Sequence, residues 1–293
     1  MECRRLGNSD LNVSVYAFGA WQLGDTAYWG EEAETDAEAV VQTAIDAGVN
    51  LFDTAEGYGA GRSEEVLGGA LGARRNDVYI ASKVSPENCV PPTRLRAACE
   101  ASLKRLRTDR IDLYLLHWRG STPLQNTLEA FQTLQREGKI HHWGVSNFDT
   151  DDLNELLAVA GKEKIACNQV LYHLQERAIE HAVIPWCEQH GVAVVAYSPF
   201  GHNEFPSPRS PAGQVLQAVV ADDHVRFGVG LAQRLGGLHA LWCDEDRCGR
   251  GTAHQQGLIT GLFRRAVRGH LTAVIADAAV ASRDDAGTQT AFL

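Results

Sequence analysis

The sequence predicts an α/β fold of the (β/α)8 barrel class, and two features support this prediction. Seven apolar runs of strand length alternate with six segments of helical periodicity, at a spacing of roughly 25 to 30 residues, which is typical of right-handed βαβ units. Three of the runs end in the titratable residues Asp53, Lys83 and His117. A parallel barrel brings the carboxyl ends of its strands to one rim, where such residues can act together.

The predicted strands are short apolar runs that end in polar residues or glycines. In chain order they cover residues 13–18, 49–52, 78–83, 111–117, 141–146, 166–170 and 192–197. No G-x-G-x-x-G motif follows the first run, which counts against an open dinucleotide-binding sheet. A chain of this length and alternation favours eight units closed into a barrel.

The first predicted helix, 34–47, shows the helical pattern most clearly. Val40, Val41, Ala44 and Ile45 share one face, and Gly48 ends the helix. This amphipathic pattern is expected of a helix that covers one face of the sheet.

End signals mark the later helices. Ser63 is the expected cap of the second helix. The third covers 93–107, and the fourth covers 122–137, with Pro123 at its first position and Gly138 at its end. Thr150 is expected to cap the fifth, and the sixth, 179–190, stops at Gly191.

Composition excludes several classes of function. The chain has 293 residues, 44% of them apolar and 22% charged, which suits a large globular domain. A net charge of -10 argues against a nucleic-acid partner, and no apolar run approaches the roughly 20 residues of a membrane helix. The N-terminus lacks an apolar secretion segment, and the seven cysteines show no paired metal-binding spacing. We therefore expect reduced thiols, no metal site and a cytoplasmic location.

The stretch from Asp53 to Tyr58 is the first candidate for a functional site. An acid ends a buried strand, and a phenol flanked by glycines follows five residues later. A plain strand-to-turn junction explains this stretch equally well when it is taken alone. The recurrence of polar strand ends at Lys83 and His117 favours a site.

Beyond this pattern, a series of short motifs occurs in a characteristic order. They are Arg5-Leu6-Gly7 with Ser9, Phe52-Asp53-Thr54-Ala55 with Tyr58-Gly59, Gly61-x-Ser63-Glu64, Lys83, Leu115-Leu116-His117-Trp118, Gly144-Val145-Ser146-Asn147-Phe148, Asn168-Gln169 and Ala196-Tyr197-Ser198-Pro199. With these motifs the chain resembles the aldo-keto reductases, NADPH-dependent enzymes on a (β/α)8 barrel. The resemblance covers residues 1–223, which we expect to form the barrel through its seventh strand.

The resemblance implies a catalytic set of four residues, and elementary chemistry supports it. Hydride delivery to a carbonyl leaves an alkoxide, so the site needs a proton donor. A phenol, with a pKa of about 10, is too weak a donor unless a nearby ammonium lowers that pKa. Tyr58 would be the donor, Lys83 would tune it and Asp53 would hold Lys83. His117 would donate a hydrogen bond to the substrate oxygen.

The resemblance also implies a cofactor site and a substrate pocket. Ser146, Asn147 and Gln169 would bind the nicotinamide carboxamide, and Tyr197 would stack on its ring. The full expected cofactor set is Trp21, Asp53, Ser146, Asn147, Gln169, Tyr197, Ser198 and Phe200, with the last two beside the pyrophosphate. The expected pocket residues are Trp21, Tyr28, Trp29 and Trp118. Aromatic walls favour apolar or aromatic carbonyl compounds, although core packing near the rim explains part of this cluster.

The expected function is therefore the reduction of an aldehyde or ketone by NADPH, with NADH as the alternative cofactor and a small carbonyl compound as the partner. A non-catalytic cofactor-binding subunit on the same barrel is one alternative, and a C-terminally damaged, inactive reductase is another. The complete set of Asp53, Tyr58, Lys83 and His117 favours the enzyme. The natural substrate and the oligomeric state stay open.

The resemblance is lost in residues 224–293, which we expect to form an atypical C-terminal region. A translated reading-frame shift near residues 220–228 is favoured over a divergent segment, and both stay open. Val274-Ile275-Ala276 is the best candidate for an eighth strand. We expect an incomplete last βα unit, unpaired edges on the first and seventh strands, weak cofactor binding and poor discrimination between NADPH and NADH.

Overall fold

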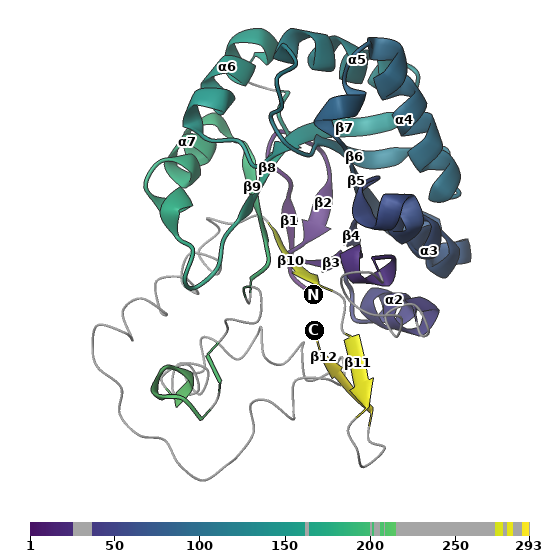
Figure 1. Ribbon diagram of the computed structural model, residues 1–293, viewed down its shortest axis with the longest axis vertical. Coiled ribbons are helices and arrows are strands. Elements are labelled where there is room, and N and C mark those ends of the chain that lie inside the picture. Colours follow the sequence, from purple (N-terminus) through teal and green to yellow (C-terminus); the bar gives the residue numbers. More distant parts are fainter. Residues whose placement is uncertain are drawn as a thin grey trace.

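A closed barrel of eight parallel strands forms the centre of the computed structural model (Figure 1). The structure describes residues 1–25, 37–161, 164–199, 201, 206–207, 209–214, 273–277, 280–283 and 289–292. The strands, in their order around the barrel, are β10 (Ala273–Asp277), β3 (Tyr16–Gly19), β4 (Leu51–Asp53), β5 (Tyr79–Val84), β6 (Ile111–Leu116), β7 (Ile140–Ser146), β8 (Cys167–Leu171) and β9 (Ala193–Tyr197). The predicted barrel is confirmed.

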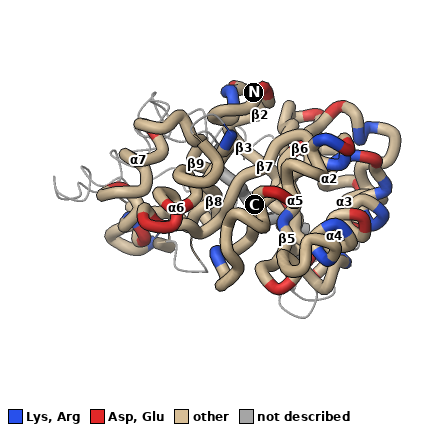
Figure 2. Tube along the Cα trace, turned by 90° about the horizontal axis from the view of Figure 1, so that it is seen from above, with Lys and Arg blue, Asp and Glu red and all other residues tan. Residues whose placement is uncertain are grey.

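Helices cover the outside of the barrel (Figure 1). They are α2 (Ala37–Asp46), α3 (Arg62–Leu71), α4 (Pro92–Arg105), α5 (Leu124–Arg136), α6 (Thr150–Ala160) and α7 (Val183–His190). Charged residues gather on the outer helices α2, α3 and α4, whereas the strands beneath carry few (Figure 2). None of the described helices is long and apolar enough to cross a membrane.

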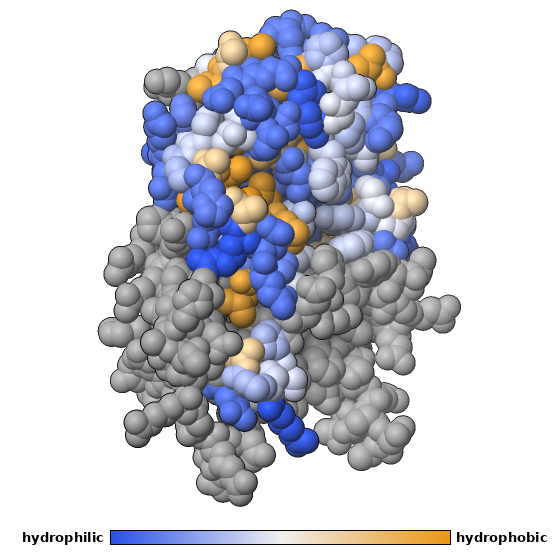
Figure 3. All heavy atoms as spheres, turned by 60° about the vertical axis from the view of Figure 1, so that its left-hand side comes forward, coloured by the Kyte–Doolittle hydropathy of each residue, from blue (hydrophilic) through white to orange (hydrophobic). Residues whose placement is uncertain are grey.

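Two buried clusters make up the core. The larger lies between the strands and the helices, where Phe131 of α5 packs against Tyr114 and Trp143 with ring centroids 5.7 and 6.0 Å apart. The smaller fills the interior of the barrel, where Leu113 and Leu115 of β6 are buried. On the face seen in Figure 3, hydrophobic side chains lie among many hydrophilic ones, as on an ordinary protein surface.

A hairpin that was not predicted precedes the barrel. The run 13–18 was predicted as one strand, but the chain divides it into β2 (Asn12–Ser14), which pairs antiparallel with β1 (Cys3–Arg5), and β3. The division falls at Val15, whose backbone N–H donates to the carbonyl of Glu2. Leu6, Leu11 and Val13 are buried in the interior cluster, so the hairpin closes the amino-terminal end of the barrel.

Two expected helix caps are wrong. Ser63 lies inside α3, and its hydroxyl donates to the carbonyl of Ala20 and bonds the Thr54 hydroxyl. The cap of α6 is Asp149, one residue before the expected Thr150, because its carboxylate accepts from two backbone N–H groups at 2.9 Å. A long-range partner therefore places Ser63, whereas α6 uses the carboxylate that directly precedes Thr150 as a local cap.

Helix starts also differ from the prediction. The predicted helix 179–190 divides into a 3-10 helix, Ala178–Glu180, and α7. Pro123 lies at the cap of α5 rather than at its first helical position. Residues 34–36 of the first predicted helix lie outside the described residues, and α2 is described from Ala37.

The eighth strand is in place. β10 contains the candidate Val274-Ile275-Ala276 and pairs in parallel with β3 on one side and β9 on the other. The expectation of unpaired edges on the first and seventh strands is therefore wrong, because a short β-prone run supplies the backbone groups both edges need. A separate hairpin of β11 (Val280–Arg283) and β12 (Gln289–Phe292) follows. The expected boundary at residue 223 lies outside the described residues.

Candidate active site

Neighbouring strands place the candidate catalytic residues at one rim of the barrel. Asp53 is the last residue of β4, Lys83 lies one residue before the end of β5, and His117 directly follows β6. The pairing of these three strands in parallel brings their carboxyl ends together. The rim follows from the fold class, as the sequence predicted.

A short 3-10 helix, Tyr58–Gly61, carries the phenol back over the rim. Glu56 ties the loop before this helix both to β5 and to the loop that follows β5. The backbone N–H of Glu56 donates to the carbonyl of Lys83, and its carboxylate accepts from Ser85 N at 2.7 Å and Asn88 Nδ2 at 2.8 Å. These bonds fix the position of Tyr58 relative to Lys83.

The Lys83 ammonium is the centre of the candidate site. The side chain is fully buried, and Nζ donates to Asp53 Oδ1 at 2.5 Å, the carbonyl of Thr54 at 2.9 Å and the Tyr58 hydroxyl at 3.3 Å. Burial acts to lower the pKa of Lys83, but attraction to Asp53 and Tyr58 outweighs it, so the pKa is raised. At neutral pH a positive charge therefore lies beside the phenol oxygen.

Asp53 links the two sides of the barrel. Its Oδ1 accepts from Lys83, and its Oδ2 accepts from Gln169 Nε2 at 2.8 Å. The buried carboxylate therefore has a cation on one oxygen and an amide donor on the other, as a buried charge requires.

His117 presents a neutral imidazole beside Tyr58. Burial, together with repulsion from Lys83, lowers the pKa of His117 from 6.5 to about 3. The two rings meet edge to face with centroids 5.7 Å apart, and Trp21 stacks on the other side of Tyr58 at 5.5 Å. At physiological pH the imidazole thus keeps one N–H to donate and carries no charge.

The opposite wall of the site is a hydrogen-bonded set of amides and hydroxyls. The Ser146 hydroxyl donates to the carbonyl of Gln169 at 2.9 Å. Asn147 Nδ2 lies 3.1 Å from both the His117 carbonyl and Ser146 Oγ, and its Oδ1 accepts from the Tyr197 hydroxyl at 2.9 Å. Asn147 and Ser198 have φ of 62° and 51°, a left-handed backbone that is unusual for residues other than glycine.

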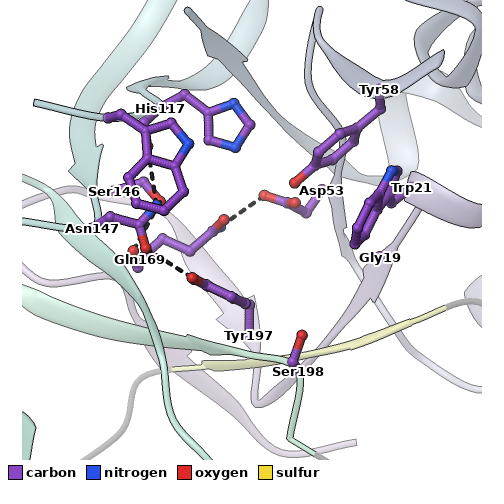
Figure 4. A pocket seen from close by; sticks show the side chains of 11 residues that line it. Gly19, Trp21, Asp53, Tyr58, His117, Ser146, Asn147, Gln169, Tyr197 and Ser198 are labelled. Carbon is purple, nitrogen blue, oxygen red and sulfur yellow. Dashed lines mark hydrogen bonds between the residues drawn. The ribbon is translucent and has the colours of Figure 1, made fainter. Parts of the chain in front are cut away.

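These side chains surround one cavity of about 220 Å³ (Figure 4). Tyr58, His117 and Tyr197 point into a common space, with Asp53 between them. The lining residues are Gly19, Trp21, Asp53, Tyr58, His117, Trp118, Ser146, Asn147, Gln169, Tyr197 and Ser198. Trp118 stays 53% exposed, so part of the rim is an accessible aromatic surface.

Most residues selected from the sequence converge on this cavity, and Lys83 lies buried behind Tyr58. Three of the selected residues, Tyr28, Trp29 and Phe200, lie outside the described residues. Two residues of the site were not predicted from the sequence: Gly19, which lines the cavity, and Glu56, which holds the Tyr58 loop in place. Each lies two residues from a selected aromatic residue, but no motif or spacing in the sequence points to either of them.

Known proteins share this sequence and fold. The sequence profile described as the Aldo/keto reductase family matches residues 16–210. The chain belongs to the aldo/keto reductase family. Among curated relatives, Methylglyoxal reductase YeaE of Escherichia coli is 43% identical over 228 residues, covering 78% of this chain and 77% of that protein. Aldo-keto reductase YhdN of Bacillus subtilis is 33% identical and covers 67% of this chain and 61% of that protein.

Solved structures of aldo/keto reductases share the fold. A structure from Klebsiella pneumoniae in complex with NADP and acetate is 34% identical, with a TM-score of 0.67, and the match covers 86% of this chain and 99% of that one. Among the curated sequence relatives, a further protein from E. coli is named an NADH-specific methylglyoxal reductase. It is 32% identical, and the match covers 66% of each chain. The comparisons support an oxidoreductase that uses a nicotinamide cofactor.

Proposed function

We propose that this aldo/keto reductase reduces the carbonyl group of an aldehyde or ketone to an alcohol, with NADPH as the hydride donor. The observation that carries the proposal is the contact of 3.3 Å between Lys83 Nζ and the Tyr58 hydroxyl at the wall of the cavity. A charged ammonium at this distance favours the phenolate and so makes the phenol proton easier to release.

Tyr58 acts as the proton donor to the substrate oxygen. As hydride reaches the carbonyl carbon, negative charge develops on that oxygen, and a donor held beside it lowers the barrier. The neutral His117 ring next to Tyr58 supplies a second hydrogen bond to the same oxygen and orients the substrate. Asp53 positions Lys83 by accepting a hydrogen bond from its Nζ.

The residues opposite Tyr58 fit the nicotinamide end of the cofactor. An amide and a hydroxyl, from Asn147 and Ser146, face the cavity beside the Gln169 amide, and such groups pair well with a carboxamide. Tyr197 offers an aromatic face for the nicotinamide ring. When bound there, the cofactor supplies the hydride. Gln169 keeps its bond to Asp53, and this bond connects the proposed nicotinamide site to the Asp53–Lys83 ion pair.

The size and lining of the cavity, together with the names of the relatives, indicate which substrates to test first. A space of about 220 Å³ with Trp21 and Trp118 at its wall suits small carbonyl compounds, including aromatic ones. Two relatives are named methylglyoxal reductases, at 43% and 32% identity. We therefore propose methylglyoxal and small aromatic aldehydes as substrates. Poor discrimination between NADPH and NADH stays a prediction.

The test is a turnover assay with purified full-length chain. NADPH or NADH is mixed with methylglyoxal, aromatic aldehydes or a small ketone, and the loss of the reduced nicotinamide absorbance is followed. We expect oxidation that depends on the carbonyl compound and yields the alcohol. Protein that binds NADPH but oxidises it with none of these compounds would instead support a non-catalytic cofactor-binding role.

A further inference from the structure

Two histidines and an aspartate meet at the end of the barrel opposite the cavity. Asp10 lies in the turn between β1 and β2, and His141 and His142 stand near the start of β7. Their possible ligand atoms all lie within 4.8 Å of one another. At about 3.3 Å per residue, His141 is roughly 16 Å along the strand from Ser146, so this group is separate from the candidate active site.

From this cluster we propose a binding site for a divalent transition cation of the zinc type. Two imidazoles and one carboxylate are ligands that such ions accept, and three protein ligands leave a position for water. The Cys spacing of the sequence suggested no metal site, because residues 10 and 141 come together only in the folded chain.

The distances suit one shared ion after small side-chain movements. Asp10 Oδ1 lies 2.7 Å from His142 Nε2 and 3.8 Å from His141 Nε2, and the two imidazole centroids are 4.4 Å apart. Ligand atoms about 2.1 Å from one tetrahedral ion lie about 3.4 Å from each other, which is between the two observed values. Rotation of exposed side chains is enough to reach that geometry.

Exposure and charge also favour a cation. The side chains of Asp10, His141 and His142 are 72%, 50% and 20% exposed, so an ion has access from solvent. The Asp10 carboxylate supplies the one full negative charge of the site, which favours a cation over a neutral or anionic ligand.

An ordinary ion pair between His142 and Asp10 would also hold the hairpin to β7, and His141 separates the two explanations. The hydrogen bond joins Asp10 to His142, whereas His141 stays 3.8 Å away. A purely structural ion pair does not need His141, but a three-ligand ion site does. His181, which is exposed near the start of α7, provides a matched control histidine.

The experiment titrates zinc chloride into chelator-treated, full-length protein by calorimetry. We expect one site in the wild type with a dissociation constant on the order of 10 µM, weaker than a closed four-ligand site. His141→Ala and Asp10→Asn should each weaken that binding at least about tenfold, and His181→Ala should leave it unchanged. Zinc should also raise the melting temperature of the wild type and the His181→Ala protein, but not that of the other two.

Two results would overturn the proposal. One is the absence of zinc binding by the wild type up to about 1 mM, which is weaker than any useful site. The other is zinc binding that His141→Ala and Asp10→Asn leave intact, since the ion would then be held by other residues. The His141→Ala protein keeps the bond between Asp10 and His142, so loss of the hairpin cannot account for its result.

Discussion

Replacing Lys83 by Met tests whether the buried ion pair at the rim holds the site together. The side chain of Met matches the length of the lysine stem but removes the ammonium, which bonds Asp53, the Thr54 carbonyl and Tyr58. Asp53 then stays buried without a cation, since its side chain is only 5% exposed. Breaking one side of a buried pair typically destabilises a protein by about 3–5 kcal/mol, so we expect a loss of that size.

Urea unfolding measures this loss. With an m-value of about 3 kcal/mol/M for a chain of this size, the midpoint should fall by about 1–1.7 M. The control is Lys139→Met, which removes a partly exposed lysine at the surface that bridges Glu100 and Glu137. Exposed ion pairs contribute little, so the control should shift the midpoint far less.

A double variant shows whether the loss comes from the uncompensated charge. Asp53→Asn combined with Lys83→Met removes both charges. We expect the stability loss of this double variant to be smaller than the sum of the two single losses by at least about 1 kcal/mol. If Lys83→Met shifts the midpoint no more than Lys139→Met, or if the two single losses simply add, the reasoning about the buried pair is wrong.

Two further predictions concern the electrostatics and the packing. The pKa of His117 is about 3 in the folded chain and 6.5 when unperturbed, so below pH 6.5 the unfolded state binds a proton that the folded state does not. A change from pH 8 to pH 5 should therefore lower the free energy of unfolding of the wild type by about 2 kcal/mol, and His117→Gln should remove that decrease. The free energy of unfolding is measured against pH by urea unfolding, and parallel curves for the two proteins would contradict the prediction. Gly7→Ala places a Cβ against the Ala166 carbonyl and 2.6 Å from Ala193 N at a φ of 49°, so we expect a loss of about 2–5 kcal/mol in the same assay. Gly138→Ala, at a φ of 72° with open space around it, should lose only about 1 kcal/mol, and equal losses for the two glycines would refute the close approach.

The position of the candidate catalytic residues could be predicted because it depends on chain topology. Parallel strands of one barrel have their carboxyl ends at the same rim, so a polar residue at the end of an apolar run is placed by the run itself. Asp53 and Lys83 end such runs, so topology predicts that they meet at one rim, whereas the ion pair between them is what the family resemblance implies. The roles assigned to them stay predictions until the variants are measured.

Features set by long-range hydrogen bonds could not be predicted. The break between β2 and β3 depends on a bond from Val15 to Glu2, and the place of Ser63 depends on the Ala20 carbonyl, 43 residues away. Local periodicity and capping preferences contain no information on such partners. For the same reason Glu56 was not recognised, since its bonds reach Ser85 and Asn88 on another loop.

The eighth strand shows a different limit of sequence reasoning. The run Val274-Ile275-Ala276 was recognised as a candidate strand, but its pairing with both β3 and β9 was not expected. Strand pairing uses backbone N–H and C=O groups, which every residue but proline provides, so a short run closes a barrel without family-like side chains. Loss of resemblance in the tail therefore did not imply an open barrel.

Catalysis by Tyr58 is the central claim, and Tyr58→Phe tests it most directly. The steady-state rate of carbonyl reduction and the dissociation constant of NADPH are measured on the same preparations of wild type and variant. Positioned acid catalysis contributes about 10² to 10⁴ in rate, so we predict a loss of that size in kcat. We predict an almost unchanged NADPH dissociation constant, because the phenol acts on the substrate oxygen. A Tyr58→Phe protein that turns over at nearly the wild-type rate would contradict the account.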